Sequence, residues 1–148
     1  MITTGFPWSN STRKTEIVDV ANGVSCSDLA DFPLVIAGSV GVNLDGTPVV
    51  CGGYGSSVWS DKCYSLTNGV WEEFATMKEK RRWAAAVVHN NKLHMFGGYS
   101  GSSNLQTSET INIDFEVSDE PDLPTGVWRH AMTKIDDTMP ILTLSKAG

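Results

Sequence analysis

The 148-residue sequence has no long apolar run, and no stretch approaches the roughly 20 apolar residues that a membrane-spanning helix requires. It also has no excess of basic charge, because 11 Lys and Arg residues against 17 Asp and Glu residues leave a formal net charge of −6. Without a basic stripe, a protein cannot displace the counterions of a phosphate backbone. The one basic cluster, Lys78 to Arg82, is interpreted as a solvated loop. We therefore expect neither a membrane nor a nucleic-acid partner.

Residues that carry catalysis are equally scarce. The three histidines, His89, His94 and His130, fall in separate predicted strands or turns, and none has a second ligand at metal spacing. No serine lies in the G-x-S-x-G pattern of a nucleophile elbow, and the cysteines lack a helix N-terminus that would stabilise a thiolate. We therefore predict no metal site, no cofactor and no enzymatic activity.

Cysteine is rare as well, with three in the chain. Cys51 ends one predicted strand and Cys63 lies in the next, so an antiparallel hairpin would place them opposite each other at bridging distance. A disulfide there would favour an extracellular, oxidising compartment, whereas two buried free thiols would suit the cytoplasm. The sequence leaves both alternatives open, and Cys26 has no evident partner.

What the sequence does contain is a repeat. Gly52-Gly53-Tyr54 returns as Gly97-Gly98-Tyr99, 45 residues later, and each copy follows a short run of strand-forming residues. Paired glycines at a strand end indicate a positive φ or a close backbone approach. A period of roughly 40 to 50 residues is typical of propeller blades, each a four-stranded antiparallel sheet that has to stack on its neighbours. We therefore predict an all-β repeat protein.

These residues resemble the kelch repeat, in which a double glycine closes the second strand, an aromatic residue follows on the third or fourth, and an arginine opens the next unit. The positions that carry the resemblance are Gly52, Gly53, Tyr64, Trp71, Arg82, Gly97, Gly98, Phe115 in a weaker aromatic slot, and Arg129. The resemblance implies a kelch-type β-propeller with strands a to d from the central channel outward. It also implies structural roles for the repeat positions, with Trp71 and Arg82 packing between blades.

The blade pattern divides the chain into four parts. Residues 1–31 are expected to form a partial blade with strands b, c and d, and residues 32–77 a complete blade. Residues 78–124 are expected to form a second complete blade with a weaker strand d, and residues 125–148 strand a with a degraded strand b. The propeller is thus incomplete within one chain. We expect either further blades of a longer chain or a homodimer that completes six blades.

The resemblance also implies where a protein partner would bind. In kelch proteins partners often dock on the loops between strands b and c, contacting the residue after the double glycine and the arginine-bearing loop before strand a. In this chain those positions are Phe6, Trp8, Tyr54, Trp59, Arg81 and Tyr99. Aromatic residues and arginine dominate interface energies. The structural alternative is that the tyrosines pack on the next blade and that Trp59 caps the core.

The predicted function is therefore a non-enzymatic protein-protein interaction module whose partner is unidentified. One alternative is part of a propeller enzyme, such as a kelch-like oxidase or sugar isomerase, with its active site in other blades. Another is a degenerate fragment without function, which Thr4 and Leu144 indicate because they stand where glycines are expected.

Overall fold

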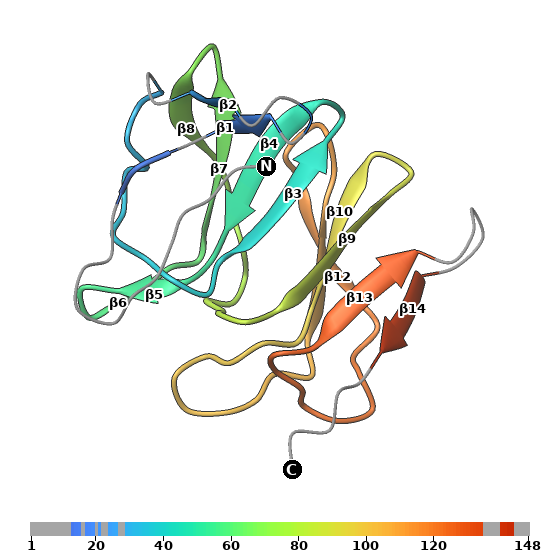
Figure 1. Ribbon diagram of the computed structural model, residues 1–148. Coiled ribbons are helices and arrows are strands. Elements are labelled where there is room, and N and C mark those ends of the chain that lie inside the picture. Colours follow the sequence, from blue (N-terminus) through green and yellow to red (C-terminus); the bar gives the residue numbers. More distant parts are fainter. Residues whose placement is uncertain are drawn as a thin grey trace.

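The computed structural model describes residues 13–15, 17–19, 21, 24–26, 29–134 and 140–143. Within these residues the fold is all β, with antiparallel sheets and no helix (Figure 1). The described part of the chain accordingly holds no helix that could cross a membrane. The predicted partner contacts Phe6 and Trp8 lie outside the described residues.

The first complete sheet is a four-stranded meander in the order β3-β4-β7-β8. Its strands are β3 (Val40–Leu44), β4 (Thr47–Cys51), β7 (Lys62–Thr67) and β8 (Val70–Thr76). Asp45 and Gly46 form the turn between β3 and β4, and both residues have positive φ, 49° and 83°, as a tight two-residue hairpin turn requires. A small hairpin of β5 (Tyr54–Gly55) and β6 (Val58–Trp59) stands between β4 and β7.

The second complete sheet repeats this order in the next part of the chain. It consists of β9 (Ala85–His89), β10 (Lys92–Phe96), β11 (Ser108–Ile111) and β12 (Val117–Glu120), paired as β12-β11-β10-β9. Asn90 and Asn91 form the first turn with φ of 49° and 54°. The last strand is four residues long where its counterpart β8 has seven.

Two short hairpins flank these sheets. β1 (Ile17–Asp19) pairs with β2 (Val24–Cys26), and β13 (Ala131–Lys134) pairs with β14 (Pro140–Thr143). They lie where the sequence places strands c and d of the first unit and strands a and b of the last. Completion of a propeller by a second copy or by further blades stays a prediction, because a single chain is described.

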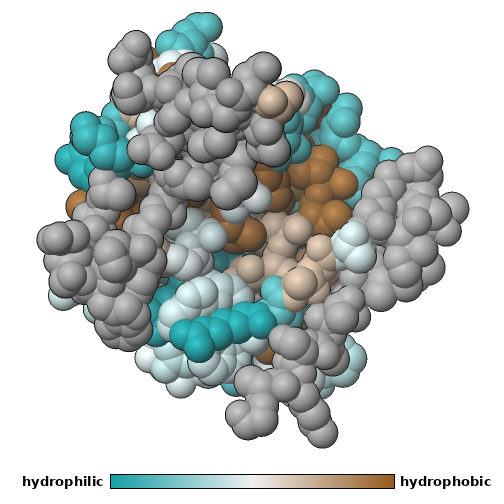
Figure 2. All heavy atoms as spheres, viewed as in Figure 1, coloured by the Kyte–Doolittle hydropathy of each residue, from teal (hydrophilic) through white to brown (hydrophobic). Residues whose placement is uncertain are grey.

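The two complete sheets stack face to face over one apolar core. β3 lies against β9, and β9 against β13, so the first strands of successive units follow one another across the molecule (Figure 1). The shared core contains Leu44, Val49, Cys51, Cys63, Ala75, Met77, Leu93, Met95 and Ile111. Burying one large apolar side chain contributes about 1.5–3 kcal/mol, so this shared core holds the sheets together. In the same view, apolar side chains gather in the middle of the face, where β3 and β9 meet (Figure 2).

Trp71 joins the first described residues to the first sheet. Its indole N–H donates a hydrogen bond of 2.8 Å to the Thr15 hydroxyl, 56 residues away, and both side chains are buried. The Phe32 ring stands edge-on to the Trp71 and Tyr64 rings at centroid distances of 5.0 and 5.1 Å. Trp71 therefore packs between successive parts of the chain.

The backbone of each glycine pair contacts the segment that leads into the following unit. The N–H of Gly53 donates to the Arg81 carbonyl at 2.8 Å, and the N–H of Gly98 donates to the Val127 carbonyl at 2.7 Å. A Cβ atom on Gly52 would lie 2.3 Å from the same Arg81 oxygen. The close backbone approach that the glycines predict is therefore present, and it joins one sheet to the next.

Candidate functional site

Seven side chains form a continuous patch at one end of the two sheets, which we call the aromatic-arginine surface. Its members are Tyr54, Trp59, Arg82, Trp83, Tyr99, Trp128 and Arg129. They come from the β5–β6 hairpin, from the residue that follows the second glycine pair, and from the segments that precede β9 and β13. Six of the seven are half-buried and Arg129 is exposed, so the patch faces solvent.

The rings of this surface contact one another in sequence. Trp59 lies between Tyr54 and Tyr99, with centroid distances of 4.6 and 5.8 Å. Trp128 continues the row, 6.2 Å from Tyr99 and 5.2 Å from Trp83. Aromatic pairs in this distance range attract each other beyond the effect of burial alone. The structure thus brings together Tyr54, Trp59 and Tyr99, three of the predicted partner contacts.

Arg82 occupies the centre of the patch. The central carbon of its guanidinium is 3.7 Å from the Trp83 ring centroid and 4.8 Å from that of Trp59. The rings of Tyr54 and Tyr99 lie at 5.3 and 5.5 Å. All four distances are within the range of a cation-π interaction, which contributes about 0.5–1 kcal/mol at an exposed site.

Arg129 adds a second guanidinium beside the same indole. It lies 4.2 Å from the Trp83 centroid and 4.6 Å from that of Trp128. Trp83 and Arg129 both have left-handed backbones, with φ of 55° and 53°, which bulky side chains rarely adopt. Such strain persists only where the surroundings impose it.

The backbone that imposes this conformation repeats along the chain. The N–H of Trp83 donates to the Gly38 carbonyl at 2.7 Å, and the N–H of Arg129 donates to the Trp83 carbonyl at 3.0 Å. Arg129 is therefore the counterpart of Trp83, and Trp128 the counterpart of Arg82. The sequence paired Arg129 with Arg82 because both are arginines, which is wrong by one residue, since the backbone bonds of the two linkers place Val127 at the position of Arg81.

The tyrosines are anchored through their backbones in the same way. Tyr54 exchanges two hydrogen bonds of 2.9 Å with Ala37, and Tyr99 exchanges two, of 2.9 and 3.1 Å, with Arg82. The Tyr99 hydroxyl also donates to the Gly101 carbonyl at 3.1 Å. The backbone is thus held by neighbouring strands while the side chains stay half-exposed, so the patch is rigid before any ligand arrives.

Arg81 requires a correction. The sequence placed it among the partner contacts, but its side chain is 0% exposed. It donates hydrogen bonds to the carbonyls of Gly97 at 2.6 Å and Thr107 at 3.1 Å, and it forms an ion pair with Glu109. Glu109, itself 1% exposed, also accepts the backbone N–H groups of Lys78 and Glu79. Arg81 is therefore part of the junction between the sheets and cannot contact a partner.

Arg82 was expected to pack between successive units, and its guanidinium lies between the Tyr54 and Trp59 rings of the first unit and the Tyr99 ring of the second. These contacts also place it in the solvent-facing patch. Sequence reasoning also missed Trp83 and Trp128 as surface residues. The signal was available, because each segment before an inner strand carries adjacent Trp and Arg residues, Arg82-Trp83 and Trp128-Arg129.

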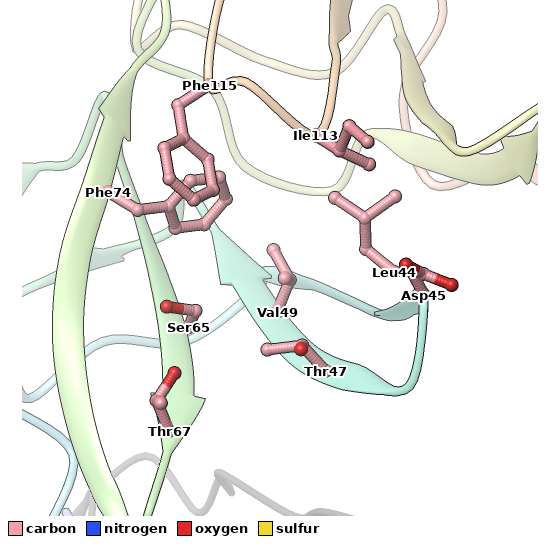
Figure 3. Close-up of a pocket in the computed structure, with 9 residues that line it drawn as sticks. All are labelled: Leu44, Asp45, Thr47, Val49, Ser65, Thr67, Phe74, Ile113 and Phe115. Atoms are coloured by element: carbon pink, nitrogen blue, oxygen red, sulfur yellow. The ribbon is translucent and has the colours of Figure 1, made fainter.

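A pocket of 210 Å³ lies at the opposite end of the first sheet, beside the β3–β4 and β7–β8 turns (Figure 3). Its lining residues are Leu44, Asp45, Thr47, Val49, Ser65, Thr67, Phe74, Ile113 and Phe115. Figure 3 shows the Phe115 ring against the Phe74 ring, with Leu44, Asp45 and Ile113 on the other side. The pocket is smaller than the roughly 300–1,000 Å³ of most ligand sites and holds one charged group. It is therefore the weaker candidate.

Titratable clusters are sparse in the described residues. No group of three or more His, Cys, Asp or Glu side chains among them is arranged to hold a metal ion. His94 contacts the Thr110 hydroxyl at 3.2 Å and the Glu120 carboxylate at 3.3 Å, in the middle of the second sheet. Burial lowers the pKa of His130 below its ordinary value of 6.5.

The comparisons with known proteins show a distant similarity that is consistent with the repeat pattern. No protein family model matches the chain. Beta-scruin from Limulus polyphemus, a kelch-repeat protein, is 28% identical over 82 residues. The matched stretch covers 50% of this chain and 9% of beta-scruin, so the chain corresponds to a small part of that relative. What is established is an all-β chain of antiparallel sheets with distant similarity to a kelch-repeat protein.

Proposed function

We propose that this chain is part of a kelch-type β-propeller and acts as a non-enzymatic protein-interaction module that binds its partner through the aromatic-arginine surface. One observation carries the proposal: five aromatic rings and two guanidiniums contact one another on a solvent-facing patch. Tyr, Trp and Arg are the residues that contribute most to binding energy at protein interfaces. Loops at the end of a stacked β scaffold are a common location for such contacts.

The rigidity of the patch supports the same function. Its tyrosines and Trp83 are held by backbone hydrogen bonds to neighbouring inner segments, and the rings restrict one another. A surface that is ordered before binding loses little conformational entropy when a partner docks. Little of the interaction free energy is then needed to order the protein.

The cysteine pair supports an oxidising compartment. Cys51 and Cys63 are opposite each other on β4 and β7, and their sulfurs lie at disulfide-bonding distance. Disulfides persist mainly in secreted and extracellular proteins. We therefore propose that the module acts outside the reducing cytoplasm.

The proposal is tested by selecting binders without assuming a partner. The chain is immobilised and used to enrich a random peptide display library, and the enriched peptides are then measured against a Trp59→Ala/Tyr99→Ala variant. We expect at least a tenfold loss of affinity, because two central rings are removed. The matched control is Phe115→Ala, an exposed aromatic at the opposite end of the sheets, which should bind normally.

Circular dichroism and thermal unfolding of both variants show whether the fold is retained. The proposal is wrong if no peptide is enriched, or if enriched peptides bind the folded double variant as well as they bind the unchanged chain.

A further inference from the structure

We infer that the 210 Å³ pocket between the two complete sheets binds a small primary amine, whose ammonium group pairs with Asp45 and whose apolar part lies against Phe74 and Phe115. The inference goes beyond the proposed function, because the pocket lies at the opposite end of the sheets from the aromatic-arginine surface. It follows from which elements build the pocket, from how its apolar and polar groups are divided, and from the charge of its lining.

Both complete sheets contribute to the pocket. Leu44, Val49 and Phe74 belong to β3, β4 and β8 of the first sheet, and Ile113 and Phe115 to the turn between β11 and β12 of the second. The Phe74 and Phe115 rings meet across this boundary, with a centroid distance of 5.0 Å and an interplanar angle of 61°. A ligand in the pocket would therefore contact both sheets at once and would bind only the folded chain.

The turn that carries Phe115 holds its ring at the pocket. The Phe115 backbone is left-handed, with φ of 68°, which bulky side chains rarely adopt. The N–H of Phe115 donates to the Asn112 carbonyl at 3.0 Å, and the side-chain oxygen of Asn112 accepts the N–H groups of Asp114 and Glu116 at 3.0 and 2.9 Å. These bonds impose the strained backbone, so the position of the ring is set before a ligand arrives.

Exposed apolar surface gathers at the same place. The Phe115 side chain is 54% exposed and that of Ile113 is 48% exposed. They are two of the four large hydrophobic side chains that are exposed in the described part of the chain. Apolar groups that stay exposed at a concave site indicate where the apolar part of a ligand binds.

The polar groups of the pocket lie apart from the rings. Figure 3 shows Thr47, Ser65 and Thr67 below the two phenylalanine rings, and Asp45 lies in the turn that precedes Thr47. A hydroxyl oxygen accepts hydrogen bonds from N–H donors, as a carboxylate does. The pocket thus has an apolar half and an accepting half, and its volume limits the ligand to one small amphipathic molecule.

Asp45 determines the charge of that molecule. It is the one charged residue among the described residues that line the pocket, and no Lys, Arg or His in the described part of the chain forms an ion pair with it. An ammonium group brings three donors and no acceptor, which suits a carboxylate beside hydroxyl groups. An anionic ligand would be repelled by Asp45 and by a chain with a net charge of −6.

The test uses three probes of similar shape and different charge, namely phenethylamine, phenethyl alcohol and phenylacetate. Calorimetric titration of the full chain at low salt measures the affinity of each. We expect the amine to bind about five- to tenfold more tightly than the alcohol, because its hydrogen bonds to Asp45 are charge-assisted, and phenylacetate to bind most weakly. The amine should also raise the thermal unfolding midpoint more than the alcohol does at equal concentration.

Two variants identify the groups responsible. Asp45→Asn keeps a residue that this type of hairpin turn favours, so the fold should be retained while the preference for the amine over the alcohol is abolished. Phe115→Ala should weaken the amine and the alcohol by a similar factor. The matched control is Asp119→Asn, which removes an exposed carboxylate that pairs with Lys78 and does not line the pocket, and it should leave both affinities unchanged. Thermal unfolding without ligand checks the fold of each variant.

Three results would overturn the inference. They are failure of the amine to bind, equal affinities for the amine and the alcohol, and a preference for the amine that persists in Asp45→Asn. Loss of amine binding in Trp59→Ala/Tyr99→Ala would also overturn it, because the amine would then bind the aromatic-arginine surface. The selection of peptides by that surface is measured separately, so failure here leaves the proposed function untouched.

Discussion

Arg81 and Arg82 are adjacent in the chain, but they belong to two regions that compensate a positive charge in different ways. Arg81 lies in the buried junction between the sheets, where Glu109 and two backbone carbonyls accept its hydrogen bonds. Arg82 lies in the aromatic-arginine surface, where four ring faces surround it and no carboxylate of the described residues forms an ion pair with it. The buried charge of Arg81 is compensated by an ion pair, whereas the half-buried charge of Arg82 is compensated by ring faces.

The two regions also differ in how they repeat. At the junction, Gly53 and Gly98 each donate to the linker before the next inner strand, at 2.8 and 2.7 Å. On the surface, the place of Arg82 is taken by Ala37 in the preceding unit, since each of them bridges the tyrosine after a glycine pair. The contacts that assemble the sheets are therefore periodic, whereas the arginine at the centre of the surface is not, because Ala37 and Trp128 stand at the corresponding positions.

The largest effect is expected from breaking the buried ion pair. Glu109→Gln removes the buried partner of the Arg81 guanidinium and leaves only the half-exposed Glu79 carboxylate, 3.8 Å away; breaking a buried pair typically costs about 3–5 kcal/mol of unfolding free energy. Urea denaturation measures the loss. The matched control is Lys78→Gln, which breaks an exposed pair with Asp119 and should cost less than about 1 kcal/mol. Equal costs for the two variants would show that burial of the pair contributes nothing.

The next largest effect is expected at the glycine that faces the Arg81 carbonyl. Gly52→Ala places a Cβ atom 2.3 Å from that oxygen in a left-handed backbone, so we expect a loss of about 2 kcal/mol or more. Gly46→Ala is the control, because its φ is also positive but nothing lies within 4 Å of the added atom. The difference between their unfolding free energies isolates the close approach of the two sheets. No difference would mean that the linker moves away at no cost.

A smaller effect on stability is expected from a substitution in the aromatic-arginine surface. Arg82→Ala removes the stacked guanidinium and should lower the unfolding free energy by about 0.5–1 kcal/mol. The same change should weaken binding of the peptides that the unchanged chain selects. A loss as large as that of Glu109→Gln would show that Arg82 is as structural as Arg81.

The smallest effect is expected from pH. Burial lowers the pKa of His130 below 6.5, so the unfolded chain takes up this proton before the folded one does. The contribution of His130 to stability is therefore complete above pH 6.5 and is lost as the pH falls below it. His130→Gln should unfold with a weaker dependence on pH between 6.5 and the acid range, measured by thermal scans. If the pH dependence of stability is the same in this variant, a group other than His130 takes up the proton on unfolding.

Local features account for what sequence reasoning found. Tight hairpin turns need residues that tolerate positive φ, so Asp45 and Gly46 mark a turn wherever the chain is placed. The glycine pairs mark close approaches for the same reason. The opposition of Cys51 and Cys63 on neighbouring strands also follows from strand pairing, although the sequence left the disulfide and the free thiols as equal alternatives.

The composition of the site could be predicted only in part. Tyr54 and Tyr99 were found because they follow the glycine pairs, and Trp59 because it lies in the adjoining hairpin. Trp83 and Trp128 were missed because the adjacent Trp and Arg residues mark these two segments but do not say which of the side chains faces solvent.

The sequence by itself determined the 45-residue repeat, the turns and the strands, because each depends on the φ and the alternation that neighbouring residues allow. Only the tertiary structure decided which of two adjacent arginines is buried. Successive side chains of an extended segment point to opposite sides, and which side faces the junction depends on long-range backbone bonds such as the one from Trp83 to Gly38. The same bonds impose the left-handed backbone at Trp83 and Arg129, and so they assemble the aromatic-arginine surface.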